Sequence, residues 1–295
     1  MQLITPLHFA EYELIDCGGF EKLERFGKHI TCRPEPQALW DKALPQKEWD
    51  KLQHVKFVAV SSSTGKWNKT KEMPDQWFIN YPFQHIDNSR KKISLRLGLT
   101  SFKHVGVFPE QAVNWDFIYN SVKKLKTEKP KVLNLFAYTG ASSLAACAAG
   151  ADVTHLDSIK QVVTWARQNM ETSNLDNIRW MVEDALTFVK REVKRGNKYN
   201  GIILDPPAFG HGPNGENWKL EDMMNDMLKN VKQILLDEDC FLVLNTYSLG
   251  FSSLLIENLM DSIFGKSTDR EFGEIYLKST TNYNLPLGVF SRFYK

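Results

Sequence analysis

The stretch Val132-Leu-Asn-Leu-Phe136-Ala-Tyr-Thr-Gly140 joins a short apolar run to a turn that ends in glycine. The small residues from Ala141 to Ala149 predict a helix directly after it, so the segment has the form strand, turn, helix. Backbone N–H groups of such a turn and of the helix N-terminus can face a ligand, and glycine lets that ligand approach closely. The same turn is equally well interpreted as an ordinary connection between a strand and a helix.

Strands and helices continue to alternate around this segment. Helical patterns lie at 114–125, 158–171, 185–194 and 220–236, and apolar strands lie at 152–156, 178–182, 201–205 and 241–245. This alternation predicts a parallel sheet with helices on both faces. We therefore predict an α/β, Rossmann-like domain over residues 113–295, with ligands at the carboxyl ends of its strands.

Residues 1–112 have a different texture. Short apolar runs such as 11–16 and 56–60 end in Gly- or Ser-rich turns, a pattern that predicts small strands. Residues 93–97 and 103–108 indicate two more strands, which we expect to pair as a hairpin. The prediction is a small β-rich domain in front of the α/β domain.

The composition is that of a globular protein, since 42% of the 295 residues are hydrophobic and 24% are charged. A net charge of +2 is too small for bulk charge alone to bind a polyanion, although a local patch could still do so. Such a patch could come from Arg90-Lys91-Lys92 with Arg96, or from Lys123-Lys124 with Lys126.

The four cysteines, Cys17, Cys32, Cys147 and Cys240, lie far apart and form no Cys-x-x-Cys pair. This excludes a zinc knuckle, a redox dithiol and a small disulfide framework, and we expect no metal site. The chain has no apolar run of membrane-spanning length and no signal peptide at its start. A cytoplasmic protein without a membrane partner is expected.

Carboxylates follow the second and third predicted strands. Asp157 can accept both hydroxyls of a ribose, but Asp157 and Ser158 can equally cap the next helix. Asp184 can bind an adenine amino group or cap its own helix. His155 lies within a strand and is expected to be a buried core residue. Spacing alone leaves the alternatives for the carboxylates open.

The most specific motif, Asp205-Pro206-Pro207-Ala208-Phe209, follows the fourth strand. The prolines fix the backbone and have no N–H to donate, so carbonyl oxygens and one carboxylate would form a lining suited to an amine or a base edge. Phe209 offers a stacking face for a planar group. The glycine-rich loop 210–217 could act as a lid. His211 in that loop could relay a proton, or be simply exposed.

Together these motifs resemble motifs I to IV of class I S-adenosylmethionine-dependent methyltransferases. More narrowly, they resemble the bacterial branch of large-subunit ribosomal RNA methyltransferases with a Tyr-Thr-Gly loop and an Asp-Pro-Pro-x-Phe motif. The segment 104–111 and the β-rich residues before it are similar to the part that precedes the catalytic domain in that branch. The resemblance covers roughly residues 90–250. It implies S-adenosylmethionine as cofactor and RNA as partner. No separate RNA-binding PUA module is expected in front, because the chain starts too late for one.

The resemblance also implies roles for the matching positions. The cofactor would be contacted or enclosed by Asn134, Phe136, Tyr138, Thr139, Gly140, Asp157, Ser158, Asp184, Asp205, Glu110 and Gln111. The first five would surround the methionine moiety, and Asp157 would hold the ribose hydroxyls. Asp205 would also face the acceptor, and it forms the predicted catalytic set with Pro206, Pro207 and Phe209.

One departure limits the choice of acceptor. Members that methylate carbon 5 of cytosine need a cysteine beside motif IV or at the end of the fifth strand. Here those positions read Asp205-Pro206-Pro207 and Asn245-Thr246-Tyr247. A nitrogen acceptor therefore fits better.

Three classes of function compete. The first is a methyltransferase acting on RNA, ribosomal RNA in particular. The second is a methyltransferase acting on a small molecule or a protein, which the near-neutral charge favours. The third is a nucleotide-binding oxidoreductase, which the missing Gly-x-Gly-x-x-Gly spacing disfavours. The sequence leaves the acceptor and the oligomeric state open.

Overall fold

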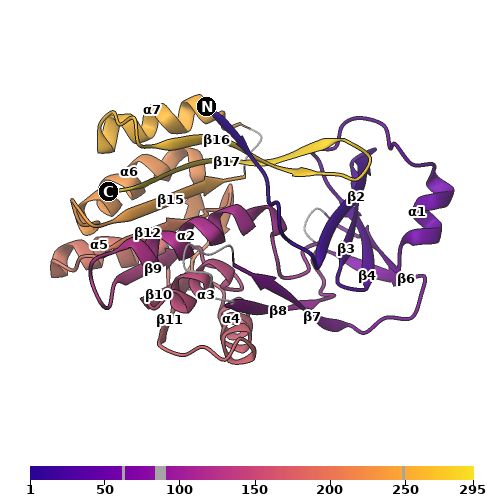
Figure 1. Ribbon diagram of the computed structural model, residues 1–295, viewed down its shortest axis with the longest axis horizontal. Helices are drawn as coiled ribbons and strands as arrows, with labels where there is room; N and C mark the ends of the chain where they lie inside the picture. Colours follow the sequence, from indigo (N-terminus) through magenta and orange to yellow (C-terminus); the bar gives the residue numbers. More distant parts are fainter. Residues whose placement is uncertain (62–63, 84–90, 248–249) are drawn as a thin grey trace.

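The computed structural model describes residues 1–61, 64–83, 91–247 and 250–295, and its largest element is an eight-stranded sheet (Figure 1). Its strands lie in the order β1 (Gln2–Ile4), β16 (Glu271–Lys278), β17 (Asn284–Tyr294), β15 (Phe241–Thr246), β12 (Gly201–Leu204), β9 (Lys131–Leu135), β10 (Asp152–Asp157) and β11 (Ile178–Val182). From β15 to β11 every pair is parallel, whereas β17 is antiparallel to both neighbours. The predicted Rossmann-like sheet is confirmed. Its topological switch point lies between β9 and β12, where ligands of such sheets bind.

Helices cover both faces of this sheet. Those packed on one face are α2 (Ala112–Lys124), α3 (Ala141–Ala148) and α4 (Lys160–Thr172), and those on the other are α5 (Ala185–Arg195), α6 (Leu220–Ile234) and α7 (Ser253–Phe264). Successive strand residues point to opposite faces. Val132 and Ile203 accordingly belong to one buried cluster, while Leu133 and Ile202 belong to the other.

The N-terminal part contains the predicted β-rich unit. It is a five-stranded sheet of β2 (Tyr12–Gly18), β3 (Glu21–Phe26), β4 (His29–Pro34), β5 (Val55–Ala59) and β6 (Gly65–Lys69). Helix α1 (Gln46–Leu52) covers it with the fully buried Trp49, which packs on Leu23 and Cys32. Figure 1 shows this sheet in a lobe beside the eight-stranded sheet.

The predicted hairpin of 93–97 with 103–108 is wrong. The partner of β8 (Lys92–Gly98) is β7 (Gln76–Pro82), and residues 103–108 form no strand. Gly106 breaks any strand there, because its φ of 103° is left-handed and a Cβ would lie 2.3 Å from the Trp165 ring. Instead the segment continues into the short 3-10 helix η1 (Pro109–Gln111).

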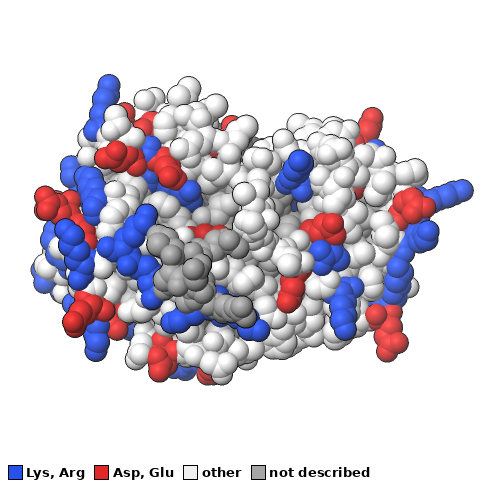
Figure 2. Space-filling view, viewed as in Figure 1, with Lys and Arg blue, Asp and Glu red and all other residues white. Residues whose placement is uncertain are grey.

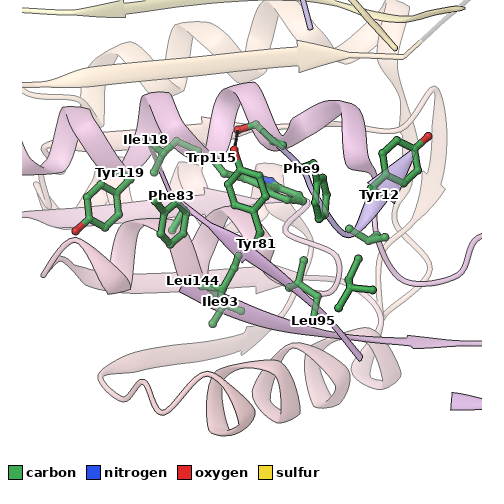
Figure 3. Close-up of a cluster of buried hydrophobic side chains, with 14 of the residues drawn as sticks. Phe9, Tyr12, Tyr81, Phe83, Ile93, Leu95, Trp115, Ile118, Tyr119 and Leu144 are labelled. Carbon is green, nitrogen blue, oxygen red and sulfur yellow. Dashed lines mark hydrogen bonds between the residues drawn. The ribbon is translucent and has the colours of Figure 1, made fainter. Parts of the chain in front are cut away.

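An aromatic cluster packs the β7–β8 hairpin and the residue that follows β7 against helix α2. Figure 3 shows Tyr81 and Phe83 facing Trp115 and Tyr119 of α2. The Tyr81 hydroxyl donates to Asp116 at 2.7 Å. Strand β1 also joins the large sheet, parallel to β16. The boundary at residue 112 stays a prediction, but elements before it contribute both a strand and a packed hairpin to the α/β part.

Residues 210–217, predicted as a loop, lie in a small hairpin whose turn is 212–216. Its strands are β13 (Phe209–His211) and β14 (Asn217–Lys219), which pair antiparallel.

None of the helices in the described ranges has the length and apolar character that a bilayer-spanning segment requires.

Candidate active site

A cavity of about 930 Å³ lies at the carboxyl ends of β9, β10, β12 and β15. Its opposite wall comes from β3, β4 and the segment 103–111. Figure 2 shows the surface hollowed between the two lobes, with basic and acidic side chains interspersed on this face. The predicted site residues that line the cavity are Asn134, Phe136, Tyr138, Thr139, Gly140, Asp157, Ser158, Asp205, Pro206, Pro207, Phe209, Glu110 and Gln111. Asp184 alone among the predicted residues does not.

The turn after β9 has an unusual backbone. Phe136 and Tyr138 have φ angles of 55° and 48°, left-handed values that are uncommon for bulky residues, and Gly140 has 90°. Several hydrogen bonds hold the turn in place, among them Tyr138 N–H to Asp157 Oδ2 at 2.9 Å and Thr139 Oγ1 to the Gly106 carbonyl at 2.6 Å. A strained backbone held at a cavity is typical of a ligand site.

Asp157 stands at the end of β10 with both oxygens oriented by backbone N–H groups. Its Oδ1 accepts from Ile159 N at 3.0 Å, and its Oδ2 accepts from Tyr138. Helix α4 begins after Ile159 and has no side-chain cap, so neither Asp157 nor Ser158 caps it. Burial raises the pKa of Asp157 despite these hydrogen bonds. The carboxylate is therefore fixed toward the cavity rather than used by the helix.

Asp184 does serve as a helix cap. It is the N-cap of α5, and its Oδ1 accepts from Thr187 N at 2.8 Å. Its neighbour Glu183 lines the cavity instead and pairs with Arg191. The geometry gives no support to an adenine contact by Asp184, because its side chain turns back to satisfy the first turn of its helix.

At the end of β12, Asp205 lines the cavity. Its Oδ1 accepts from Asn245 Nδ2 at 2.8 Å, and burial raises its pKa to about 6. The carbonyl of Pro207 accepts from Trp218 Nε1 at 2.7 Å, so one lone pair of this oxygen is already engaged. Phe209 is 68% exposed and lines the cavity mouth, where it can stack on a planar group.

The segment before α2 places Glu110 and Gln111 on the cavity. Glu110 is 5% exposed, and its Oε2 has no hydrogen-bond partner among the described residues. Burial raises the pKa of Glu110 to about 7. Gln111 is anchored, since its Oε1 accepts from Asn114 Nδ2 at 2.8 Å.

Several lining residues were not predicted from the sequence. They come from the N-terminal sheet, the segment after β8 and the end of β15: Lys22, Arg33, Glu35, Lys103, His104 and Asn245. The Tyr247 hydroxyl donates to Glu35 Oε1 at 2.7 Å and so joins the two lobes across the cavity. A polar residue at a strand end was a usable signal for Asn245. Charged residues inside β3 and β4 gave none, because alternating charge in a strand ordinarily marks a solvent face.

Of the other predicted features, the cysteines and His155 lie off the site, whereas His211 lines the cavity. All four cysteines are described, and none lines the cavity. His155 is buried against Ser143, as predicted for a core residue, and its pKa falls to about 3 because of burial. His211 is exposed at the cavity mouth and contacts Asn217.

The described members of the basic groups proposed from the sequence do not line the cavity: Lys91, Lys92, Arg96, Lys123, Lys124 and Lys126. Lys91 donates to the carbonyl of Ala148, and Arg96 stacks on Trp165. Arg90 lies outside the described residues. Within the described ranges, no group of His, Cys, Asp and Glu is arranged to hold a metal ion.

Comparison with known proteins assigns the chain to a family. The model of a family described as conserved hypothetical protein 95 matches residues 99–259, more than half of the chain. The crystal structure of the S-adenosylmethionine-dependent methyltransferase from Agrobacterium tumefaciens is 34% identical, with a TM-score of 0.89 over 100% of this chain and 93% of that chain. The chain belongs to this family of class I S-adenosylmethionine-dependent methyltransferases.

Two further relatives extend the comparison. SMU.776 in complex with SAH shares the fold, with 18% identity and a TM-score of 0.73 over 97% of this chain and 76% of that chain. Ribosomal RNA large subunit methyltransferase K/L of Shewanella frigidimarina is 29% identical over 167 residues, 52% of this chain. The match covers 22% of that relative, so this chain spans only about a fifth of its length.

Proposed function

We propose that this chain transfers the methyl group of S-adenosylmethionine to a nitrogen atom of large-subunit ribosomal RNA. The observation that carries the proposal is the one cavity in which the turn after β9, Asp157 and the end of β12 lie together. The relatives named as ribosomal RNA methyltransferases support RNA as the acceptor. An RNA substrate and four free cysteines fit a cytoplasmic protein.

In this proposal the cofactor lies along the carboxyl ends of β9 and β10. The turn 134–140 surrounds its methionine moiety, Asp157 accepts the ribose hydroxyls, and Ser158 borders the adenosine. Glu110 and Gln111 close the cavity from the side of η1. The cofactor supplies an already activated methyl group, so the protein's task is to exclude water and orient the acceptor.

The acceptor would enter beside Asp205 and Phe209. The Asp205 carboxylate accepts a hydrogen bond from an N–H of the acceptor amine. This hydrogen bond directs the nitrogen lone pair toward the methyl group. Asn245 donates to Asp205 and thereby keeps one carboxylate oxygen occupied and the other available. Phe209 would stack on the base, which must leave its own stack to reach the cavity. The absence of any cysteine from the cavity lining supports nitrogen over carbon 5 of cytosine.

The proposal also assigns a role to each of the two predicted parts, 1–112 and 113–295. The second would bind the cofactor and carry Asp205, while the first would wall the acceptor side through β3 and β4. This assignment rests on which residues line the cavity.

The first test follows tritium from labelled S-adenosylmethionine into purified large-subunit RNA, total protein and metabolites. We expect label in the RNA, and digestion should return it in an N-methylated nucleoside. Label confined to protein or metabolites, with bare RNA and ribosomal particles both inactive, would exclude RNA as the acceptor.

The second test replaces all four cysteines by Ala or Ser. If the acceptor is nitrogen, the folded variant should transfer methyl groups at close to the parental rate. A trapped covalent adduct between one cysteine and RNA in the parent protein would contradict the nitrogen proposal.

A further inference from the structure

The wall of the cavity opposite the strand ends carries three cations, Lys22 of β3, Arg33 of β4 and Lys103. Lys22 and Arg33 stand directly opposite each other in the β3–β4 ladder, an arrangement of like charges that normally destabilises a sheet. They are 6% and 2% exposed. Such a pair is stable only when carboxylates compensate it.

Two carboxylates compensate these two cations. Glu24 binds Arg33 through both oxygens, at 2.5 Å and 3.1 Å, and Glu35 Oε2 lies 3.1 Å from Lys22. Glu24 also accepts from the Tyr12 hydroxyl, and Glu35 from the Tyr247 hydroxyl. Glu24 and Glu35 are thus already engaged, whereas the third carboxyl group on this side, Glu110, has an Oε2 without a described partner and a pKa that burial raises to about 7.

Lys103 is the cation of these three that has no carboxylate partner among the described residues. Its ammonium makes no ion pair or hydrogen bond with any described residue, although its side chain is largely removed from water and lines the cavity. Its backbone is held in place, because Arg33 Nη1 donates to the Lys103 carbonyl at 3.4 Å. Burial lowers the pKa of Lys103, and the nearby Lys22 and Arg33 lower it further while Glu35 raises it.

We propose that Lys103 is the recognition residue for an oxyanion of a bound ligand, either the carboxylate of the cofactor's methionine moiety or a phosphate of the acceptor. This inference rests on the proposed function for the identity of the ligand but not for the existence of the anion site. Lys22 and Arg33 are paired with carboxylates and Lys103 has no such partner among the described residues, so a ligand oxyanion would supply its counter-charge. The segment that carries Lys103 covers the turn 136–140 through Phe108, whose ring lies 5.3 Å from Tyr138. The proposed function puts the methionine end of the cofactor at this turn, so its carboxylate would lie in the same part of the cavity.

The test uses Lys103→Met, which removes the charge and keeps the stem, and Lys103→Arg, which restores a cation. Lys51→Met on α1 is the matched control, since Lys51 is 76% exposed and does not line the cavity. Calorimetry measures the binding of S-adenosylhomocysteine and of 5′-methylthioadenosine, which lacks the amino-acid part. Thermal unfolding measures stabilisation by inorganic phosphate at fixed ionic strength, and filter binding measures large-subunit ribosomal RNA across a salt series.

If the oxyanion is the cofactor carboxylate, Lys103→Met should weaken S-adenosylhomocysteine roughly tenfold or more and leave 5′-methylthioadenosine unchanged, because a charge-assisted hydrogen bond is lost. If it is a phosphate, both adenosine ligands should bind as before. Stabilisation by inorganic phosphate should then disappear, and the salt slope of RNA binding should fall by about one. Lys103→Arg should recover most of either loss.

The proposal is overturned if S-adenosylhomocysteine, phosphate and RNA all bind Lys103→Met as they bind the parent. It is equally overturned if Lys51→Met gives the same losses, or if Lys103→Arg recovers none of them. Failure of the parent protein to label RNA would reject the proposed acceptor, while the calorimetric and phosphate measurements would still decide the anion site.

Discussion

Asp157 illustrates how one residue can be assigned by what holds it. Two backbone N–H groups fix its carboxylate, and neither belongs to the helix that follows. We expect Asp157→Ala to weaken S-adenosylmethionine binding by at least ~1.5 kcal/mol, the size of a lost charge-assisted hydrogen bond. Calorimetry on the folded variant measures this, and unchanged affinity would mean that the carboxylate only orients the Tyr138 turn.

Asp205 is the residue on which turnover should depend. Its pKa of about 6 lies above the ordinary value for an aspartate because of burial, so the carboxylate becomes ionised only as the pH rises through about 6. If the ionised form holds the acceptor, kcat of the parent should rise across that range. Asp205→Asn should lower kcat ~100-fold or more and abolish this pH step.

Phe209→Ala is the companion variant at the same end of the cavity. It should weaken acceptor binding by about 1–3 kcal/mol if the ring stacks on a base, with cofactor affinity nearly unchanged. Cofactor binding that falls in proportion to activity, in either Asp205→Asn or Phe209→Ala, would move this end of the cavity to the cofactor pocket.

At the scale of elements, helix α5 separates two interpretations that the sequence left open. Asp184 caps this helix, so Asp184→Ala should lower the free energy of unfolding by about 1 kcal/mol. Affinity for S-adenosylhomocysteine should stay the same, because Asp184 does not line the cavity. Asp184→Ser, which keeps a capping oxygen, should restore most of the stability. A variant of parental stability with weakened cofactor binding would reinstate the adenine contact.

At the scale of the whole molecule, Glu24 is the residue on which the N-terminal lobe and the cavity wall both depend. It is fully buried and pairs with Arg33 and Lys22. Burial alone would raise the pKa of Glu24, but the two cations outweigh it and lower the pKa to about 2. The stabilising contribution is therefore complete above the ordinary glutamate pKa and is lost as the pH falls toward 2.

We expect Glu24→Gln to lower the free energy of unfolding at neutral pH by about 3–5 kcal/mol, since the buried Arg33 loses its carboxylate partner and the buried Lys22 loses one of its two. Denaturant melts between pH 3 and pH 7 measure the difference, which should shrink toward acid. Glu13→Gln is the control, because Glu13 makes only a partly exposed pair with Arg25. A constant difference over the whole pH range would show that Glu24 acts through packing alone.

The sequence by itself determined the α/β architecture and the position of most of the site. The alternation of apolar strands with helical patterns between residues 132 and 246 is local, and parallel topology then brings the ends of β9, β10 and β12 to one edge. Polar residues that follow such strands had to meet there. This is why Asp157 and Asp205 could be placed on a common cavity before the structure was known.

Only the tertiary structure decided the partners that are distant along the chain. Strand β1 pairs with β16, and β8 pairs with β7 rather than with residues 103–108, because strand periodicity specifies which face is buried but not which strand lies alongside. The cap by Asp184 and the wall made by Lys22, Arg33 and Lys103 depend in the same way on where a side chain ends up. Charges in β3 and β4 look like a solvent face in the sequence, and only the packing of the two lobes turns them toward the cavity.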